Sequence, residues 1–268
     1  VSNKKKGMVK IKEKILHGIK YDFLYSESST MPTLLTESHH FPVAPFLDFN
    51  FFRFCKSQDI PIGLFYRDIY WMIDSFKKTI PFFKRLVSRI FYKYDLLQYK
   101  DKVDVLFVPS VEMYDYMNYD FPKKIVPLPP GTDLQKCNYI DTNNNSLNFI
   151  YVGGSGSDYD LFLFLKVLNN LENTHLDLCS RKDDWHMYKE KYQGLLKNVS
   201  VHHKNGQELR NIYDNNDVAV YFINPKEFGG FALGLKLFEY ISYEKPIISV
   251  KGTAIGNFVE ENDIGWSV

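Results

Sequence analysis

Lys236 and Glu239 stand three residues apart in the segment EFGGFALGLKLFEYISYEKPIISV, residues 227–250. On a helix this spacing places both side chains on one face. A lysine ammonium could meet a phosphate as a point charge, and a carboxylate could accept two hydrogen bonds from the vicinal hydroxyls of a ribose. A surface ion pair, which contributes little stability, would show the same spacing. The spacing therefore leaves a nucleotide site and a surface ion pair both open.

A second segment, NFIYVGGSGSDYD (148–160), places a glycine turn after a strand-like run. Its glycines are Gly153, Gly154 and Gly156. We expect a helix to begin near Asp158 or Asp160, and backbone N–H groups exposed at such a turn favour an anionic phosphate. The dinucleotide fingerprint would need glycine or alanine where Tyr159 stands, and the GKS or GKT of a P-loop is missing. A phosphate-binding turn and a glycine turn without a ligand both remain open.

The elements that would position these segments alternate regularly in residues 147–268. Strand-like runs are expected at 147–152, 174–179, 199–203, 217–222 and 246–250. Helical patterns are expected between them at 159–171, 184–196, 208–215 and 232–243. Short buried strands alternating with helices are typical of βαβ units, in which a parallel sheet carries helices on both faces. The sequence therefore predicts a doubly wound α/β fold.

Residues 1–130 show the same alternation less regularly. Strands are expected at 21–25, 62–66, 103–108 and 125–128, with helices from Ile69 to about Gln98 and after Ser110. The stretch 27–45 carries Pro32, Pro42 and Pro45 and is predicted to be a long loop, which is often a functional feature. We expect two Rossmann-like domains, at 1–130 and 147–268, joined by an asparagine-rich linker at 131–146.

Composition narrows the class of protein. A chain of 268 residues with 45% hydrophobic and 24% charged residues is typical of a two-domain globular protein. The net charge of +1 shows no overall basic excess, so it does not indicate nucleic-acid binding. The charge is unevenly divided, since residues 1–130 hold 20 Lys and Arg against 14 Asp and Glu, and residues 131–268 hold 13 against 18. Three cysteines without CxxC spacing argue against disulfides or zinc and fit a reducing cytoplasm. We expect neither a spanning helix nor a signal peptide.

The segment KLFEYISYEKPIIS (236–249) resembles the nucleotide-sugar-binding helix of GT-B glycosyltransferases. Other pieces occur in the same order as in that family: DVLFVPS (104–110), KIVPLPPGTD (124–133), NFIYVGG (148–154) and ELRNIYDNNDVAVYF (208–222). The resemblance extends from about residue 62 to the C-terminus. It implies two Rossmann-like domains that face a cleft, truncated at both ends relative to the family.

The resemblance also implies roles for particular residues. Glu239 would hold the ribose and Lys236 would lie near the diphosphate. The phosphates and the sugar would be lined by Gly153, Gly154, Gly156, Gly229 and Gly230. Arg181 and Lys182 follow the second strand of the donor domain and are candidate diphosphate partners, although solvated charges are the alternative. Many retaining members carry an acid eight residues before the ribose-binding glutamate, where this chain has Phe231.

The candidate catalytic base lies in residues 1–130. Asp68 follows the strand 62–66, where ligands of open α/β sheets bind, and could take the proton of an acceptor hydroxyl. Arg67 is a candidate acceptor or phosphate contact, and Glu27 is the second candidate on the acceptor side. A buried Arg67–Asp68 pair that holds the long loop is the alternative. His39 and His40 in that loop could face the acceptor or be ordinary surface residues.

The stretch Ser75–Tyr94 interleaves lysine and arginine with aromatic residues and contains no acid. Such a helix suits an anionic membrane surface, although a core-facing helix with a solvated basic face is the alternative.

We expect a cytoplasmic, peripherally membrane-associated hexosyltransferase of polysaccharide synthesis. It would need no metal or cofactor and would move a sugar from a nucleotide-diphosphate sugar to a glycan or lipid-linked acceptor. A sugar-nucleotide epimerase and a non-catalytic partner subunit are the alternatives.

Overall fold

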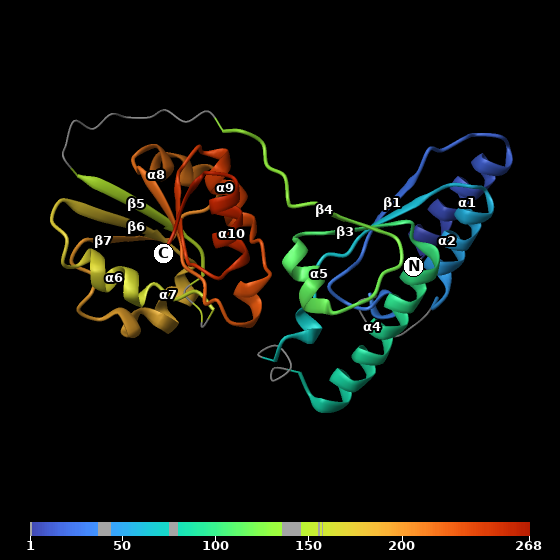
Figure 1. Ribbon diagram of the computed structural model, residues 1–268, viewed down its shortest axis with the longest axis horizontal. Coiled ribbons are helices and arrows are strands. Elements are labelled where there is room, and N and C mark those ends of the chain that lie inside the picture. The colour runs from blue at the N-terminus through green and yellow to red at the C-terminus, as the bar shows by residue number, and fades with distance from the viewer. Residues whose placement is uncertain (1, 37–43, 75–79, 136–145, 155, 157) are drawn as a thin grey trace. The chain divides into compact units, whose positions relative to one another are not determined.

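The computed structural model describes residues 2–36, 44–74, 80–135, 146–154, 156 and 158–268 (Figure 1). The chain divides into two compact units, Val1–Pro129 and Pro130–Val268. Each unit is built on its own parallel sheet, one of four strands and one of six. His39 and His40 lie outside the described residues.

The first unit holds its strands in chain order across the sheet. They are β1 (Leu24–Glu27), β2 (Ile62–Phe65), β3 (Val105–Val108) and β4 (Lys124–Pro127). The helices of this unit are α1 (Ser2–Leu16), α2 (Leu47–Ser57), α4 (Phe82–Lys102) and α5 (Val111–Met117), with the 3-10 turns η1 (Thr33–Leu35) and η2 (Tyr70–Met72). Leu64 and Leu106 pair across β2 and β3 and are both buried, which places the apolar core on the sheet.

Two predicted elements of this unit differ in the structure. The single helix expected from Ile69 is instead η2 followed by α4, which begins after Pro81. Proline lacks an N–H and disfavours helical geometry in the residue before it, so the helix begins at Phe82. The first strand lies at Leu24–Glu27 rather than 21–25, because Leu24 pairs with Ile62. Helices α1 and α2 were not predicted from the sequence.

The second unit contains a six-stranded parallel sheet in the order β10-β9-β8-β5-β6-β7. Its strands are β5 (Leu147–Val152), β6 (Thr174–Cys179), β7 (Val199–His202), β8 (Val218–Tyr221), β9 (Ile247–Ser249) and β10 (Gly265–Ser267). Counted from β5, this is the 3-2-1-4-5-6 order of doubly wound nucleotide-binding folds. The chain reverses its direction of winding between β5 and β8, so the carboxyl ends of these two strands form the switch point.

Helices cover both faces of the six-stranded sheet (Figure 1). They are α6 (Phe162–Leu168), α7 (Lys182–Tyr188), α8 (Arg210–Asp214), α9 (Leu235–Ser242) and α10 (Ala254–Glu261), with 3-10 turns η3 (Lys189–Tyr192), η4 (Gly206–Leu209) and η5 (Glu227–Gly230). One buried cluster packs α8, α9 and α10 on the sheet, and a second packs α6 and α7 on the opposite face. The predicted doubly wound α/β fold is confirmed, and β10 and α10 are additions that the sequence did not predict.

Candidate functional site

A cavity of about 750 Å³ opens at the carboxyl ends of the strands of the second unit, where β5 and β8 diverge. Its lining residues come from the ends of β5, β6 and β8, from the segments after β6 and β7, from α9 and from the stretch before β5. They include Thr132, Gln135, Tyr151–Gly154, Tyr159, Cys179–Arg181, Asp184, Lys204–Gln207, Leu209, Tyr221, Lys236, Glu239, Tyr240, Ser242 and Tyr243. This is the position at which open α/β sheets bind ligands.

Glu239 is the acidic group that α9 presents to the cavity. Its Oε2 accepts a hydrogen bond from Lys236 Nζ at 2.5 Å, and its Oε1 accepts one from the Tyr213 hydroxyl at 3.0 Å. The Lys236 and Glu239 side chains are 36% and 29% exposed, so both are reachable from solvent. The i, i+3 spacing does place both charges on one face, and that face lines the cavity.

Helix α9 is held against the sheet at the switch point. The Val152 N–H donates to the Tyr240 hydroxyl oxygen at 2.8 Å, and that oxygen lies 3.3 Å from the carbonyl oxygens of Val152 and Val220. Tyr240 is fully buried, and burial raises its pKa well above the usual value. Gly234 precedes α9, and a Cβ there would lie 2.1 Å from the Tyr221 hydroxyl oxygen, so only glycine allows this close approach.

The glycine turn after β5 meets the cavity only in part. Gly153 and Gly154 line it, whereas Gly156 is not among the lining residues. The Tyr151 hydroxyl donates to Gly154 O at 2.6 Å, and a Cβ on Gly153 would lie 2.9 Å from that hydroxyl. Helix α6 begins at Phe162, later than expected, and the Asp160 carboxylate accepts the Phe162 N–H at 3.0 Å. The structure therefore gives the cavity the turn but not the helix N-terminus expected with it.

Among the residues that the structure describes, three cations and two acids line the cavity: Arg181, Lys204, Lys236, Asp184 and Glu239. Arg181 precedes α7 directly, and Lys182, the first residue of that helix, is not among the lining residues. Lys204 was missed by the sequence reasoning. Its signal was available, because it follows a predicted strand in the same way as Arg181 does.

Gly229 and Gly230 in η5 are likewise not among the lining residues. A Cβ on Gly229 would lie 1.9 Å from Asn224 O, which explains this glycine by tight packing of the backbone. Among the described residues, no group of three or more His, Cys, Asp or Glu side chains could hold a metal ion.

The comparisons with known proteins concern the fold of the chain. No protein-family model matches the sequence, and neither does any curated protein. Sucrose-phosphate synthase from Thermosynechococcus elongatus matches 98% of this chain with a TM-score of 0.54 at 15% identity. HepE of Anabaena, solved in complex with UDP, matches 97% with a TM-score of 0.58 at 10% identity. An α,α-trehalose-phosphate synthase from Burkholderia xenovorans matches 100% with a TM-score of 0.52 at 11% identity.

The chain has a GT-B fold. It spans 65%, 67% and 66% of the lengths of those three proteins, so it corresponds to about two thirds of each. The GT-B resemblance stated for KLFEYISYEKPIIS is thereby confirmed at the level of the fold.

The first unit of this GT-B fold carries the candidate base. Asp68 is partly buried, its Oδ2 accepts a hydrogen bond from Thr30 Oγ1 at 2.8 Å, and burial raises the pKa of its carboxyl. Arg67 is exposed and its backbone N–H donates to Ser28 Oγ at 3.0 Å. Glu27 is exposed and accepts a hydrogen bond from the Tyr25 hydroxyl at 3.1 Å. A partly buried carboxyl group with a raised pKa is common at functional sites, which favours Asp68 as the base.

A second acid of the first unit was not singled out from the sequence. Asp95 on α4 is 4% exposed, and its Oδ2 accepts the Thr33 N–H at 2.7 Å. Its Oδ1 is buried and has no hydrogen-bond partner among the described residues. Burial raises the pKa of Asp95 to about 6. Thr30 and Thr33 thus tie the segment after β1 to Asp68 and Asp95 respectively.

Proposed function

We propose that the chain is a glycosyltransferase that moves a sugar from a nucleotide-diphosphate sugar to a hydroxyl of a glycan or lipid-linked acceptor. The observation that carries the proposal is the cavity at the switch point, where Glu239 and three cations face the same space. The GT-B fold supports the reaction class, and one solved protein with this fold was obtained with UDP. Synthesis of a cell-surface polysaccharide is the role we assign to it.

The cavity offers complementary groups for a nucleoside diphosphate. Glu239 would accept hydrogen bonds from the ribose hydroxyls. Arg181, Lys204 and Lys236 would meet the diphosphate charge, together with backbone N–H groups of the turn at Gly153 and Gly154. Lys236 forms an ion pair with Glu239, and binding of the diphosphate would draw the Lys236 ammonium from that ion pair toward the phosphates.

Asp68 would act as the general base of the transfer. Its carboxylate would take the proton of the acceptor hydroxyl while that oxygen forms a bond to the anomeric carbon. The bond from the anomeric carbon to the diphosphate oxygen breaks, and the nucleoside diphosphate leaves with the electron pair. The raised pKa of Asp68 makes it a stronger base than an exposed aspartate.

Phe231 stands where many retaining members of the GT-B family carry an acid. It is 3% exposed and packs on Phe228, so it belongs to the apolar core.

The donor site is tested first by binding. Thermal shift and calorimetry with UDP, GDP, ADP and CDP should show stabilisation by one of them and by its sugars. Glu239→Ala should reduce that affinity at least tenfold because the ribose loses its hydrogen-bond acceptor. Glu261→Ala, an exposed acid at the end of α10, is the matched control and should bind as the wild type does. A wild type that responds to none of the four diphosphates would overturn the proposal.

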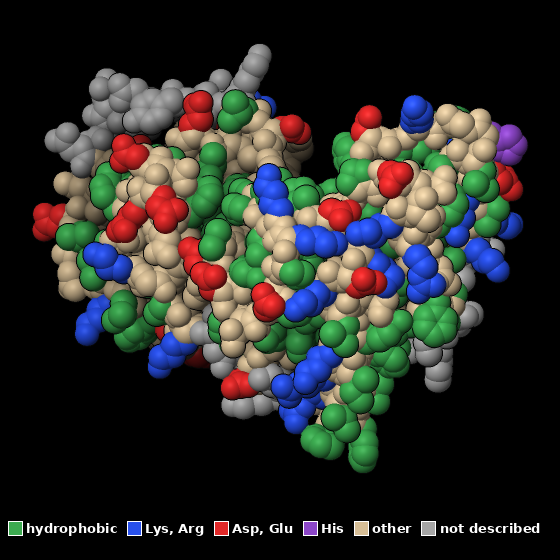
Figure 2. Space-filling model, turned by 45° about the vertical axis from the view of Figure 1, so that its right-hand side comes forward, with side chains coloured by type: hydrophobic (Ala, Val, Ile, Leu, Met, Phe, Trp, Pro, Cys, Tyr) green, Lys and Arg blue, Asp and Glu red, His purple; other side chains and the backbone are tan. Residues whose placement is uncertain are grey.

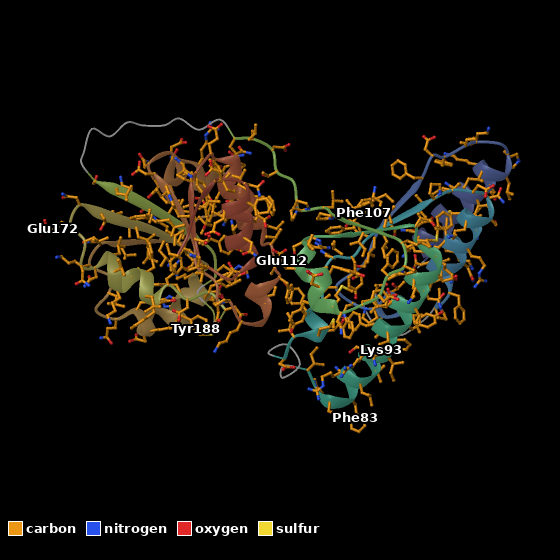
Figure 3. All side chains as sticks on the ribbon, viewed as in Figure 1. Phe83, Lys93, Phe107, Glu112, Glu172 and Tyr188 are labelled. Atoms are coloured by element: carbon orange, nitrogen blue, oxygen red, sulfur yellow. The ribbon has the colours of Figure 1, made fainter. Side chains whose placement is uncertain are left out.

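The chain would reach a lipid-linked acceptor through the first half of α4. In residues 82–91 no side chain is buried, and Phe82 and Phe83 are 61% and 79% exposed. Figure 3 shows Phe83 near the N-terminal end of α4. At 3.6 residues per turn, the exposed apolar residues Phe82, Phe83, Leu86, Val87 and Ile90 fall within an arc of about 140°. Lys84, Arg85 and Arg89 lie on the other side. The core-facing alternative fits only the second half, where Leu96 and Tyr99 are buried.

An amphipathic helix with an exposed apolar face and flanking cations suits the surface of an anionic bilayer. Figure 2 shows hydrophobic side chains gathered beside lysine and arginine side chains at the lower end of the view. We therefore propose peripheral association with the inner face of a membrane through residues 82–91. No described helix is long and apolar enough to cross a bilayer.

Vesicle sedimentation tests this association. The wild type should sediment with phosphatidylglycerol vesicles and much less with phosphatidylcholine vesicles, and added salt should reduce binding. The double variant F82S/F83S should lose most of the binding, since it removes the two most exposed aromatic side chains of the helix. Leu163→Ser on α6, 70% exposed, is the control for loss of an exposed apolar side chain. Equal sedimentation of all three proteins would exclude this surface.

A further inference from the structure

Tyr213 contacts the candidate ribose-binding carboxylate from outside the cavity. It belongs to α8, is fully buried and is not among the residues that line the cavity. Its hydroxyl donates a hydrogen bond to Glu239 Oε1 at 3.0 Å. A ligand in the cavity would therefore meet Glu239 and not Tyr213.

The packing around Tyr213 fixes the direction of its hydroxyl. Its ring stacks on Tyr243 with centroids 4.0 Å apart and planes 10° apart, and it meets Tyr240 at 6.2 Å and 64°. A ring confined on these sides has little rotational freedom, so the hydroxyl stays aimed at Glu239. Burial and the nearby Tyr240 and Glu239 raise the pKa of Tyr213 far above its usual value, which keeps its proton available for donation.

Lys236 and Tyr213 hold Glu239 in different ways. Lys236 is a partly exposed, flexible cation on Oε2, and the proposed binding of a diphosphate would draw it away. Tyr213 is buried and holds Oε1, so its hydrogen bond would persist when the ligand is bound. A side chain that is already fixed loses less conformational freedom when it binds a ligand.

We infer that Tyr213 is a positioning residue, which orients Glu239 so that its carboxylate receives the hydroxyls of the donor ribose. This inference rests on the proposed function of the cavity. It makes the contribution of Tyr213 specific to the ribose: the residue should matter for ligands with a 2′,3′-diol and be irrelevant for ligands without one. A residue that only supported the fold would weaken all ligands alike.

The test compares Tyr213→Phe with the wild type by calorimetry. The ligands are the nucleoside diphosphate that stabilises the wild type, its 2′,3′-dideoxy counterpart and inorganic pyrophosphate. Loss of the hydrogen bond that orients Glu239 should weaken binding of the ribose-containing diphosphate roughly three- to tenfold, which is the net contribution of a typical hydrogen bond. Affinity for the dideoxy compound and for pyrophosphate should stay as in the wild type. Tyr192→Phe, a fully buried tyrosine stacked on Trp185 in the other cluster, is the control.

Glu239→Asp provides a second variant that keeps Tyr213. The shorter side chain withdraws the carboxylate from the Tyr213 hydroxyl and should reproduce the loss that is specific to the diol. Tyr213→Phe binding as tightly as the wild type, or weakening the ribo and dideoxy compounds equally, would overturn the inference. Failure of the wild type to bind any diphosphate would instead reject the function proposed for the cavity.

Discussion

The Tyr240 hydroxyl oxygen lies 2.8 Å from Val152 N and joins α9 to the last residue of β5. Glu239 is the residue before Tyr240, so this hydrogen bond holds the candidate ribose acceptor above the switch point of the sheet. Two features of the fold thus form the site. The strand order creates the crevice, and a buried tyrosine fixes the helix that carries the charge into it.

Tyr240→Phe should destabilise the second unit by about 1–3 kcal/mol, because it leaves the buried Val152 N–H without an acceptor. The variant should also bind nucleoside diphosphates more weakly than the wild type. Urea denaturation followed by tyrosine and tryptophan fluorescence would measure the change in the free energy of unfolding. Tyr188→Phe, on α7 and partly exposed, should change it by less than about 0.5 kcal/mol.

Asp95→Asn should stabilise the first unit near neutral pH. Burial raises the pKa of Asp95 from its usual value of 3.8 to about 6, so between these pH values the folded state binds more protons than the unfolded state. Stability from this group is present at low pH and is lost as the pH rises through about 6. Removing the charge should therefore give a gain on the order of 2–3 kcal/mol at pH 7 that fades toward pH 4.

The measurement is denaturant unfolding of Asp95→Asn and the wild type at intervals from pH 4 to pH 7. The amide oxygen of asparagine can still accept the Thr33 N–H, so the segment after β1 keeps its tie to α4. Asp115→Asn, an exposed acid on α5, should show no such pH-dependent gain. A difference between Asp95→Asn and the wild type that is the same at every pH would contradict the assignment.

Much of the second unit could be predicted from the sequence because its central strands, β5 and β8, are mostly buried on both faces. Runs such as DVAVYF read as strands without knowledge of their neighbours, and β8 occupies Val218–Tyr221 within that run. The segment 232–243 also identified α9 and its two charges. Those elements could be predicted because each depends on the hydrophobic pattern of its own short segment.

The contacts that complete the site are not local. Tyr213 precedes Glu239 by 26 residues in the sequence and reaches it only because α8 and α9 pack on the same face. Asp95 sits in a basic amphipathic helix, and its burial depends on the packing of α4 against η1 and α2. The strand β10 has only three residues, and its position comes from pairing with β9, while α10 packs in the buried cluster that also holds α8 and α9.

Asp68→Asn should lower the rate of sugar transfer by about 10²–10⁴-fold while leaving nucleoside diphosphate affinity unchanged, because it removes a proton acceptor and not a donor contact. Single-turnover assays with the donor and the acceptor, alongside calorimetry, separate the two effects. Glu27→Gln, which alters the other candidate acid, should keep most of the activity. Loss of transfer in Glu27→Gln with normal rates in Asp68→Asn would move the role of base to Glu27.

Chelation should leave both diphosphate binding and transfer intact. Arg181, Lys204 and Lys236 line the cavity and can offset the charge of a diphosphate without a divalent ion. With excess EDTA, the affinity and the turnover should stay within about twofold of the untreated protein. Lys204→Met should instead weaken diphosphate binding and reduce its salt dependence, since one cation is removed from the set. Activity that disappears with EDTA and returns with added Mg²⁺ or Mn²⁺ would show that the three cations are not sufficient.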